Sequence, residues 1–148
     1  MGTYAQNACK YFKEGYNCAQ SVLLAFAPLI NFDNETALKL ASSFGGGMGR
    51  LREVCGAVTS MFMIAGILKG YSSNMDDVVK AKHYELIQFL GNKFKEQSGS
   101  LICREILGIE STDSSPIPSI RTAQYYKERP CENCIKIAAE IIEKELLD

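Results

Sequence analysis

The chain has 148 residues, six cysteines and a formal net charge of −1, with acidic and basic residues interspersed along it. This length can bury a core without disulfides, and the charge balance excludes the basic surface that nucleic-acid-binding and membrane-surface proteins use. No uncharged run reaches the roughly 20 residues of a transmembrane helix, and Lys10, Lys13 and Glu14 interrupt any N-terminal signal core, so we expect one cytoplasmic domain over residues 1–148.

Hydrophobic residues recur with helical spacing, and glycine and proline clusters separate the amphipathic stretches. This pattern predicts an all-α fold. The first helix should cover residues 5–14, and Asn17 should cap the second. A third should run from Asp33 or Asn34 to residue 44, where the glycine-rich segment 45–49 should not remain helical.

Residues 54–68 are predicted to form a helix that is apolar on almost every side, so we expect a compact bundle built around it. Small residues four apart would let a neighbouring backbone approach this helix closely. They are Gly56 and Ser60, then Gly66 and Gly70.

Three further elements complete the prediction. A long helix should cover residues 74–97 with Val79 and His83 on its inner face, followed by a short helix that Ser100 caps. Residues 110–119 should form a loop or lid, because two prolines and several hydroxyl residues occur there. The last helix should span residues 131–147.

Four cysteines fall where separate helices are predicted to begin: Cys18, Cys55, Cys103 and Cys131. Because a helix N-terminus presents unpaired N–H groups and the positive end of the helix dipole, it should lower the pKa of a thiol there. Cys131 and Cys134 form a C-x-x-C motif, in which one thiol can attack and the other can resolve. Cys9 lies in the middle of the first helix and is interpreted as core filling.

Two chemistries remain open for Cys18, Cys55, Cys103, Cys131 and Cys134. In a dithiol protein, a thiolate, with Cys131 or Cys55 favoured, attacks a disulfide and a neighbouring thiol resolves the adduct. In a metal protein, Cys18, Cys55, Cys103 and Cys131 hold an iron–sulfur cluster or, less favoured, zinc. Whether the protein is an enzyme, its redox partner and its homo-oligomeric state stay open.

Other features are weaker. The glycine run before Arg50 and Arg52 lacks the lysine of a phosphate-binding loop, so it is interpreted as a close approach of backbone to the cysteines. His83, the single histidine, is interpreted as a hydrogen-bonded core residue. Solvent-exposed salt bridges are the default interpretation of Arg50, Arg52 and Arg104.

Five segments together resemble the C_GCAxxG_C_C family of putative redox-active proteins. They are Asn17–Val22 (NCAQSV), Phe44–Gly49 (FGGGMG), Cys55–Ser60 (CGAVTS), Cys103–Gly108 (CREILG) and the cysteine-led C-terminal helix. The resemblance implies a small, mostly helical prokaryotic protein with four characteristic cysteines, which match Cys18, Cys55, Cys103 and Cys131 here. Such proteins are often encoded near transporters.

This chain departs from the family's pattern in two places. Ser60 stands where the C-G-A-x-x-G motif ends in glycine, and Cys134 is an addition. A related domain is similar to part of an iron–sulfur multihaem cytochrome, which implies a cluster as one cofactor. The neighbouring transporter genes imply a further alternative, a non-enzymatic accessory protein of a transporter-linked system, which would show scattered buried cysteines and an exposed apolar patch.

Overall fold

The computed structural model describes residues 2–108 and 115–147, and its regular elements are helices throughout this part of the chain. The prediction of a compact all-α fold is confirmed. The helices are α1 (Thr3–Lys13), α2 (Cys18–Phe26), α3 (Asn34–Ser42), α4 (Gly45–Met48), α5 (Gly56–Lys69), α6 (Asp77–Ser98), α7 (Cys103–Leu107), α8 (Ala123–Glu128) and α9 (Cys131–Glu145). None of the helices in these ranges is both long enough and apolar enough to span a membrane.

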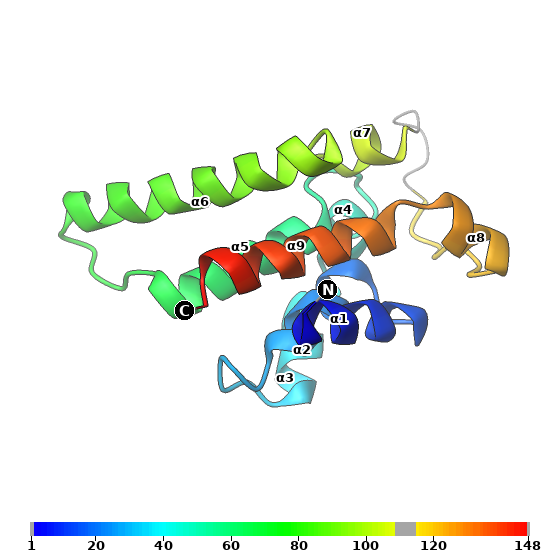
Figure 1. The fold of residues 1–148 in the computed structure, drawn as a ribbon, viewed down its shortest axis with the longest axis horizontal. Coiled ribbons are helices and arrows are strands. Elements are labelled where there is room, and N and C mark those ends of the chain that lie inside the picture. Colours follow the sequence, from blue (N-terminus) through cyan, green and yellow to red (C-terminus); the bar gives the residue numbers. More distant parts are fainter. Residues whose placement is uncertain (1, 109–114, 148) are drawn as a thin grey trace.

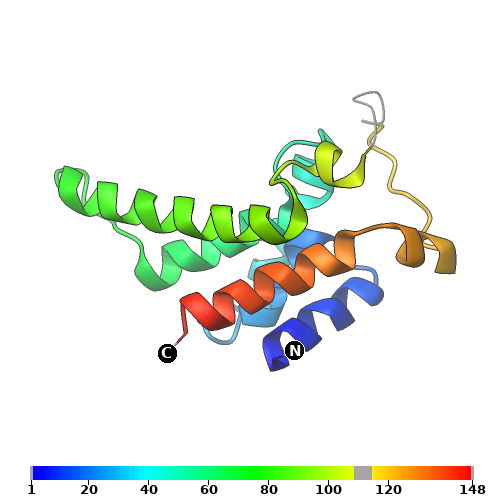
Figure 2. The ribbon, with the colours of Figure 1, turned by 45° about the horizontal axis from the view of Figure 1, so that its top comes forward.

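The helices form three layers, which Figures 1 and 2 show from two directions. α5 and α9 lie side by side in the middle, α6 lies along one side of them, and α1, α2 and α3 lie on the other. α2 packs against α1, α3, α5 and α9. The beginnings of α2, α5 and α9 are thereby brought to the same end of the molecule, beside α4 and α7.

α2 and α5 supply much of the core. Every residue from Ser21 to Ala27 is buried, and Phe26 is fully enclosed, which stabilises the fold by about 3 kcal/mol. α5 is not enclosed along its whole length, because Ile67 near its C-terminus is 53% exposed. A bundle arranged around α5 alone, as the sequence predicted, is therefore not confirmed.

The close contact between α2 and α5 depends on two small residues. A Cβ atom on Gly56 would lie 2.7 Å from Cys18 Sγ and 2.8 Å from the carbonyl oxygen of Phe44. One turn later, the hydroxyl of Ser60 donates a 2.6 Å hydrogen bond to the carbonyl oxygen of Ala19. The predicted close approach thus occurs at Gly56 and Ser60, whereas Gly66 has open space around it.

Asn17 and Asp33 cap α2 and α3 as predicted, and Asn17 forms a capping box with Gln20. Ser100 is not the N-cap of α7. That position belongs to Ile102, although the Ser100 hydroxyl accepts a 3.0 Å hydrogen bond from its backbone N–H.

The long helix and the segment after it differ from the prediction. Val79 is 41% exposed because the first half of α6 extends past the helices beneath it (Figure 1). The sequence also missed α8, whose short pattern at residues 123–128 has no buried face. Residues 109–114, which include the whole first half of the predicted lid, lie outside the described residues.

Candidate functional site

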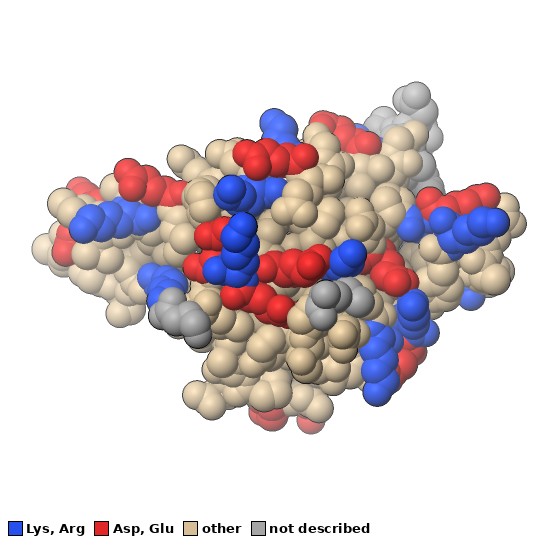
Figure 3. Space-filling model, in the orientation of Figure 1, with Lys and Arg blue, Asp and Glu red and all other residues tan. Residues whose placement is uncertain are grey.

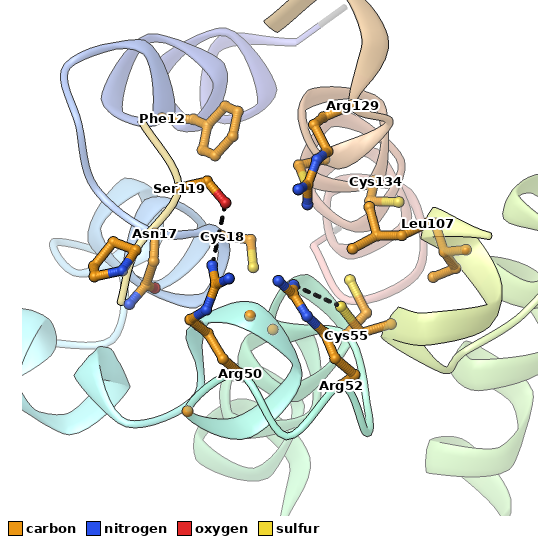
Figure 4. Close-up of a pocket in the computed structure, with 18 of the residues that line it drawn as sticks. Phe12, Asn17, Cys18, Arg50, Arg52, Cys55, Leu107, Ser119, Arg129 and Cys134 are labelled. Atoms are coloured by element: carbon orange, nitrogen blue, oxygen red, sulfur yellow. Dashed lines mark hydrogen bonds between the residues drawn. The ribbon is translucent and has the colours of Figure 1, made fainter. Parts of the chain in front are cut away.

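Five of the six cysteines line one cavity of about 270 Å³. These five are Cys18, Cys55, Cys103, Cys131 and Cys134, and Figure 4 labels Cys18, Cys55 and Cys134 among the side chains around the cavity. As predicted, Cys18, Cys103 and Cys131 are the first residues of their helices, and Cys55 is the N-cap of α5. Cys9 is buried and does not line this cavity; its Sγ lies 3.9 Å from the carbonyl oxygen of Glu132.

A short antiparallel bridge sets the positions of Cys55 and Cys103. Val54 pairs with Ile102 in this bridge. Beside it, the N–H of Cys55 donates to the backbone oxygen of Leu101 at 2.8 Å, and the N–H of Cys103 donates to the backbone oxygen of Glu53 at 2.6 Å. The two cysteines thus begin their helices next to each other. This pairing is long-range and has no signal in the helical pattern of the sequence.

The glycine-rich segment backs directly onto the cysteines. It carries helical hydrogen bonds over one short turn, α4, yet Gly46 and Gly47 have φ values of +68° and +71°, which favour glycine. A Cβ atom on Gly47 would lie 2.5 Å from Cys103 Cβ and 2.9 Å from Arg52 Cα. The segment therefore brings backbone close to the cysteines, and the prediction of a wholly non-helical segment needs this correction at α4.

Hydrogen bonds connect three of the thiols. Cys18 bonds to Cys55, and Cys55 bonds to Cys134, so Cys55 is shared between partners on α2 and α9. The interaction with Cys55 raises the pKa of Cys18.

Backbone donors also reach this network. The N–H groups of Gly46 and Gly56 donate to the sulfur of Cys18 and act to lower its pKa. These donors belong to α4 and α5, not to the helix that Cys18 begins. They would stabilise a thiolate on Cys18 once its proton has left.

The pKa values of four cysteines move in the direction opposite to the prediction. Hydrogen bonding to a neighbouring thiol, followed by burial, raises the pKa of Cys18, and its bond to Cys134 raises that of Cys55. Burial raises the pKa of Cys103, and burial together with the neighbouring Cys18 and Cys103 raises that of Cys131 to about 12. The helix dipole argument failed because it treats each helix separately, whereas these thiols are buried together.

Four arginines line the same cavity: Arg50, Arg52, Arg121 and Arg129. In Figure 4 the guanidinium groups of Arg50, Arg52 and Arg129 point toward the space around Cys18. Arg52 is only 3% exposed and its Nη1 donates to Cys103 Sγ at 3.7 Å, which acts to lower the pKa of that thiol.

Sequence reasoning did not find all of these arginines. It singled out Arg50 and Arg52 but missed Arg121 and Arg129, which lie in and after a segment without a clear hydrophobic period. Arg129 could have been suspected because it stands two residues before the C-x-x-C motif. Arg104 forms the expected salt bridge, with Nη2 2.7 Å from Glu53 Oε1, and does not line the cavity.

His83 is also outside the cavity lining. Its ring is half-buried and lies edge-on to Tyr71, with ring centroids 5.8 Å apart. The predicted hydrogen bond is not found among the described residues, where Nδ1 has no partner.

Across residues 2–108 and 115–147, no group of three or more histidine, cysteine, aspartate or glutamate side chains is arranged to hold a metal ion. A cluster or zinc held by Cys18, Cys55, Cys103 and Cys131, which all line the cavity, stays a prediction.

The fold and the cavity together define the class: an all-α protein with free cysteines from several helix starts gathered around one cavity. Residues 16–145 match the family described as putative redox-active protein (C_GCAxxG_C_C). The chain belongs to this family, which confirms the resemblance seen in the sequence and agrees with its redox interpretation at that coarse level. No curated protein and no solved structure gives a match.

Proposed function

We propose that this protein carries out thiol–disulfide exchange, with Cys18 as attacking thiol and Cys55 as resolving thiol. The observation that carries this proposal is the grouping of the Cys18, Cys55 and Cys134 thiols in one cavity lining, where Cys55 interacts with both of the others. Two sulfurs that line one cavity and already interact can approach to the about 2.05 Å of a disulfide when one of the helix starts shifts. This assigns the pair to α2 and α5, not to the C-x-x-C motif alone.

Access and stabilisation favour Cys18 for the first step. It is half-buried, whereas Cys55 is 7% exposed and Cys134 is 2% exposed. Its sulfur accepts two backbone N–H bonds, which stabilise the thiolate that attack requires. Cys55 already contacts Cys18 and can reach its sulfur after a mixed disulfide has formed.

The reaction has two steps. The Cys18 thiolate attacks one sulfur of a substrate disulfide R–S–S–R, a Cys18–S–S–R bond forms, and the S–S bond of the substrate breaks to release RS⁻, which takes up a proton. The deprotonated Cys55 sulfur then attacks Cys18 Sγ, forms the Cys18–Cys55 disulfide and expels a second RS⁻, which is protonated. The protein loses two electrons and two protons, and the substrate gains both.

Cys134 gives Cys55 a second partner. After the first disulfide forms, the Cys134 thiolate can attack Cys55 Sγ, transfer the disulfide to α9 and regenerate the Cys18 thiol. Cys55 is therefore required for either disulfide, while Cys18 and Cys134 are each required for one. We further propose that the protein works in the cytoplasm, where reduced thiols are maintained.

The test is disulfide mapping by mass spectrometry after the reduced protein, purified without oxygen, is treated with one equivalent of 2-hydroxyethyl disulfide. We expect Cys18–Cys55 and Cys55–Cys134 disulfides in the native protein and in Cys9→Ser, whose cysteine is buried outside the cavity. Cys55→Ser should form neither and should accumulate the mixed disulfide on Cys18. Cys18→Ser should form only Cys55–Cys134.

Two results would overturn the proposal. One is an intramolecular disulfide in Cys55→Ser at the native rate, which would assign the chemistry to another pair. The other is stoichiometric iron with acid-labile sulfide, or stoichiometric zinc, in the same oxygen-free preparation, because metal ligation would occupy these thiols.

A further inference from the structure

The cavity lining has one sign of charge. It holds four arginines, and no aspartate, glutamate or lysine among the described residues. The chain as a whole has 16 basic and 17 acidic residues, and the face in Figure 3 shows the two kinds interspersed. The positive character is therefore local to the cavity that the cysteines line.

Neutral groups hold two of these arginines in place. Arg121 donates to the backbone oxygens of Phe12 at 2.6 Å and Tyr16 at 2.9 Å, and its Cζ lies 4.4 Å from the centroid of the Phe12 ring. The Cζ of Arg129 lies 5.2 Å from the centroid of the Tyr125 ring. Such contacts orient a guanidinium group and leave its full charge in place.

Arg50 and Arg52 approach from the loop between α4 and α5. Arg50 Nε donates to the carbonyl oxygen of Ser115 at 2.6 Å, and its Nη1 donates to Ser119 Oγ at 3.3 Å. Arg52 reaches Cys103, as described above. Charge thus surrounds the thiols from both sides of the cavity (Figure 4).

The rest of the lining suits a small molecule with a hydrocarbon part. A cavity of about 270 Å³ is just below the range of about 300–1,000 Å³ of most small-molecule sites. Apolar side chains line the cavity together with the arginines and the cysteines. These are Phe12, Ile106, Leu107, Pro116, Pro118 and Tyr125.

We infer that the substrate is a small disulfide whose short carbon chains end in oxyanion groups, such as carboxylates, that the cavity arginines bind. This inference rests on the proposed function and names the substrate class of the same site. Guanidinium groups match the planar, two-oxygen geometry of a carboxylate and remain charged at every pH at which a thiol reacts.

Three symmetric disulfides of nearly equal length test it: 3,3′-dithiodipropionate with terminal carboxylates, 2-hydroxyethyl disulfide with hydroxyls, and cystamine with ammonium groups. The second-order rate of thiol loss in the reduced protein is measured for each and divided by the rate of 2-mercaptoethanol with the same compound. This division removes the intrinsic reactivity of each disulfide. We expect the normalised rate to be at least about tenfold higher for the carboxylate than for the hydroxyl compound, and lowest for cystamine.

Substitution locates the effect. Arg129→Gln should reduce the ratio of the carboxylate to the hydroxyl rate several-fold. Lys144→Gln removes the same charge from the exposed outer part of α9, outside the cavity lining, and should leave this ratio unchanged. The ratio is the informative quantity because Arg129 also acts to lower the pKa of Cys131 and Cys103, which affects all three disulfides alike.

The outcomes separate the two proposals. Equal normalised rates for the three compounds, with an intramolecular disulfide formed in each case, would overturn the substrate class and leave the exchange chemistry standing. Formation of no intramolecular disulfide with any compound would overturn the exchange chemistry. In that case anion binding is tested alone with 3,3′-thiodipropionate, an unreactive thioether that should protect the cavity thiols from iodoacetamide. Absence of protection would overturn the proposed anion binding as well.

Discussion

Replacement of Gly56 by alanine is the sharpest test of how the fold brings Cys18 and Cys55 together. The new Cβ would lie 2.8 Å from the Phe44 carbonyl oxygen and 3.0 Å from the Ala19 backbone nitrogen. The first distance is about 0.6 Å shorter than the 3.4 Å at which ordinary van der Waals contact begins. Because both atoms belong to backbone, no side-chain rotation relieves the overlap, and α5 must move away from α2.

Overpacking of this kind destabilises a protein by about 1–3 kcal/mol, and alanine in place of helical glycine returns at most about 1 kcal/mol. We expect Gly56→Ala to lose about 1–2 kcal/mol of unfolding free energy, measured by urea denaturation under reducing conditions. It should also slow formation of the Cys18–Cys55 disulfide. The matched control is Gly66→Ala in the same helix, where the Cβ meets nothing within 4 Å, and it should be neutral or stabilising by up to about 1 kcal/mol.

The reasoning is refuted if Gly56→Ala is as stable as Gly66→Ala. If Gly56→Ala is stable and also forms the Cys18–Cys55 disulfide at the native rate, then the distance between α2 and α5 does not determine how fast this disulfide forms.

Three further predictions concern the buried polar groups. The folded, reduced protein binds cysteine protons more tightly than the unfolded chain, because the pKa of Cys131 is raised to about 12. Its unfolding free energy should therefore be constant below about pH 8.5 and should fall above it by at least about 1.4 kcal/mol per pH unit. Urea denaturation at pH 7 and pH 10 will detect this difference. Ser60→Ala removes the hydrogen bond to Ala19 and should cost about 1 kcal/mol by urea denaturation, with an unchanged value arguing against that bond. Arg52→Gln removes the cation that stabilises the Cys103 thiolate. Labelling of Cys103 by iodoacetamide at pH 8 should therefore slow about tenfold in a variant whose circular dichroism is native. A labelling rate equal to that of the native protein would contradict this role of Arg52.

The local features of this fold could be predicted from sequence because each depends on a few neighbouring residues. Asn17 caps α2 through a bond to the N–H of Gln20, only three residues away. The cysteine-led helix starts were visible for the same reason. The bridge between Val54 and Ile102 is a long-range pairing, and helical periodicity has no information about it.

The chemical state of the thiols could not be predicted in the same way. If the dipole of α2 were the only influence on Cys18, as in an isolated and exposed helix, it would lower the pKa of the Cys18 thiol. In the folded chain the Cys18 thiol interacts with another thiol, Cys55, which raises its pKa, and burial adds to this effect. A pKa depends on which groups meet in space, and the sequence shows the cysteines without showing that Cys55 lies between two others.

Protonated thiols beside four arginines require a reason, because the arginines alone would favour thiolates. Burial away from water weakens the charged form of each thiol, yet it also strengthens the attraction between a guanidinium group and any anion in the cavity. A substrate with two carboxylates and one attacking thiolate would bring three negative charges into the cavity that the arginines line. A bound carboxylate raises the pKa of a nearby thiol further, so the arginines are needed to compensate the negative charge of substrate and thiolate together. Salt separates the long-range attraction of the substrate to the arginines from the contacts made inside the cavity. Raising the ionic strength from about 0.01 to 1 M shortens the screening length from about 30 to 3 Å, which weakens the long-range attraction more than the contacts. The advantage of the carboxylate disulfide should therefore shrink with salt at low substrate concentration, while the position of the disulfide within the protein stays the same.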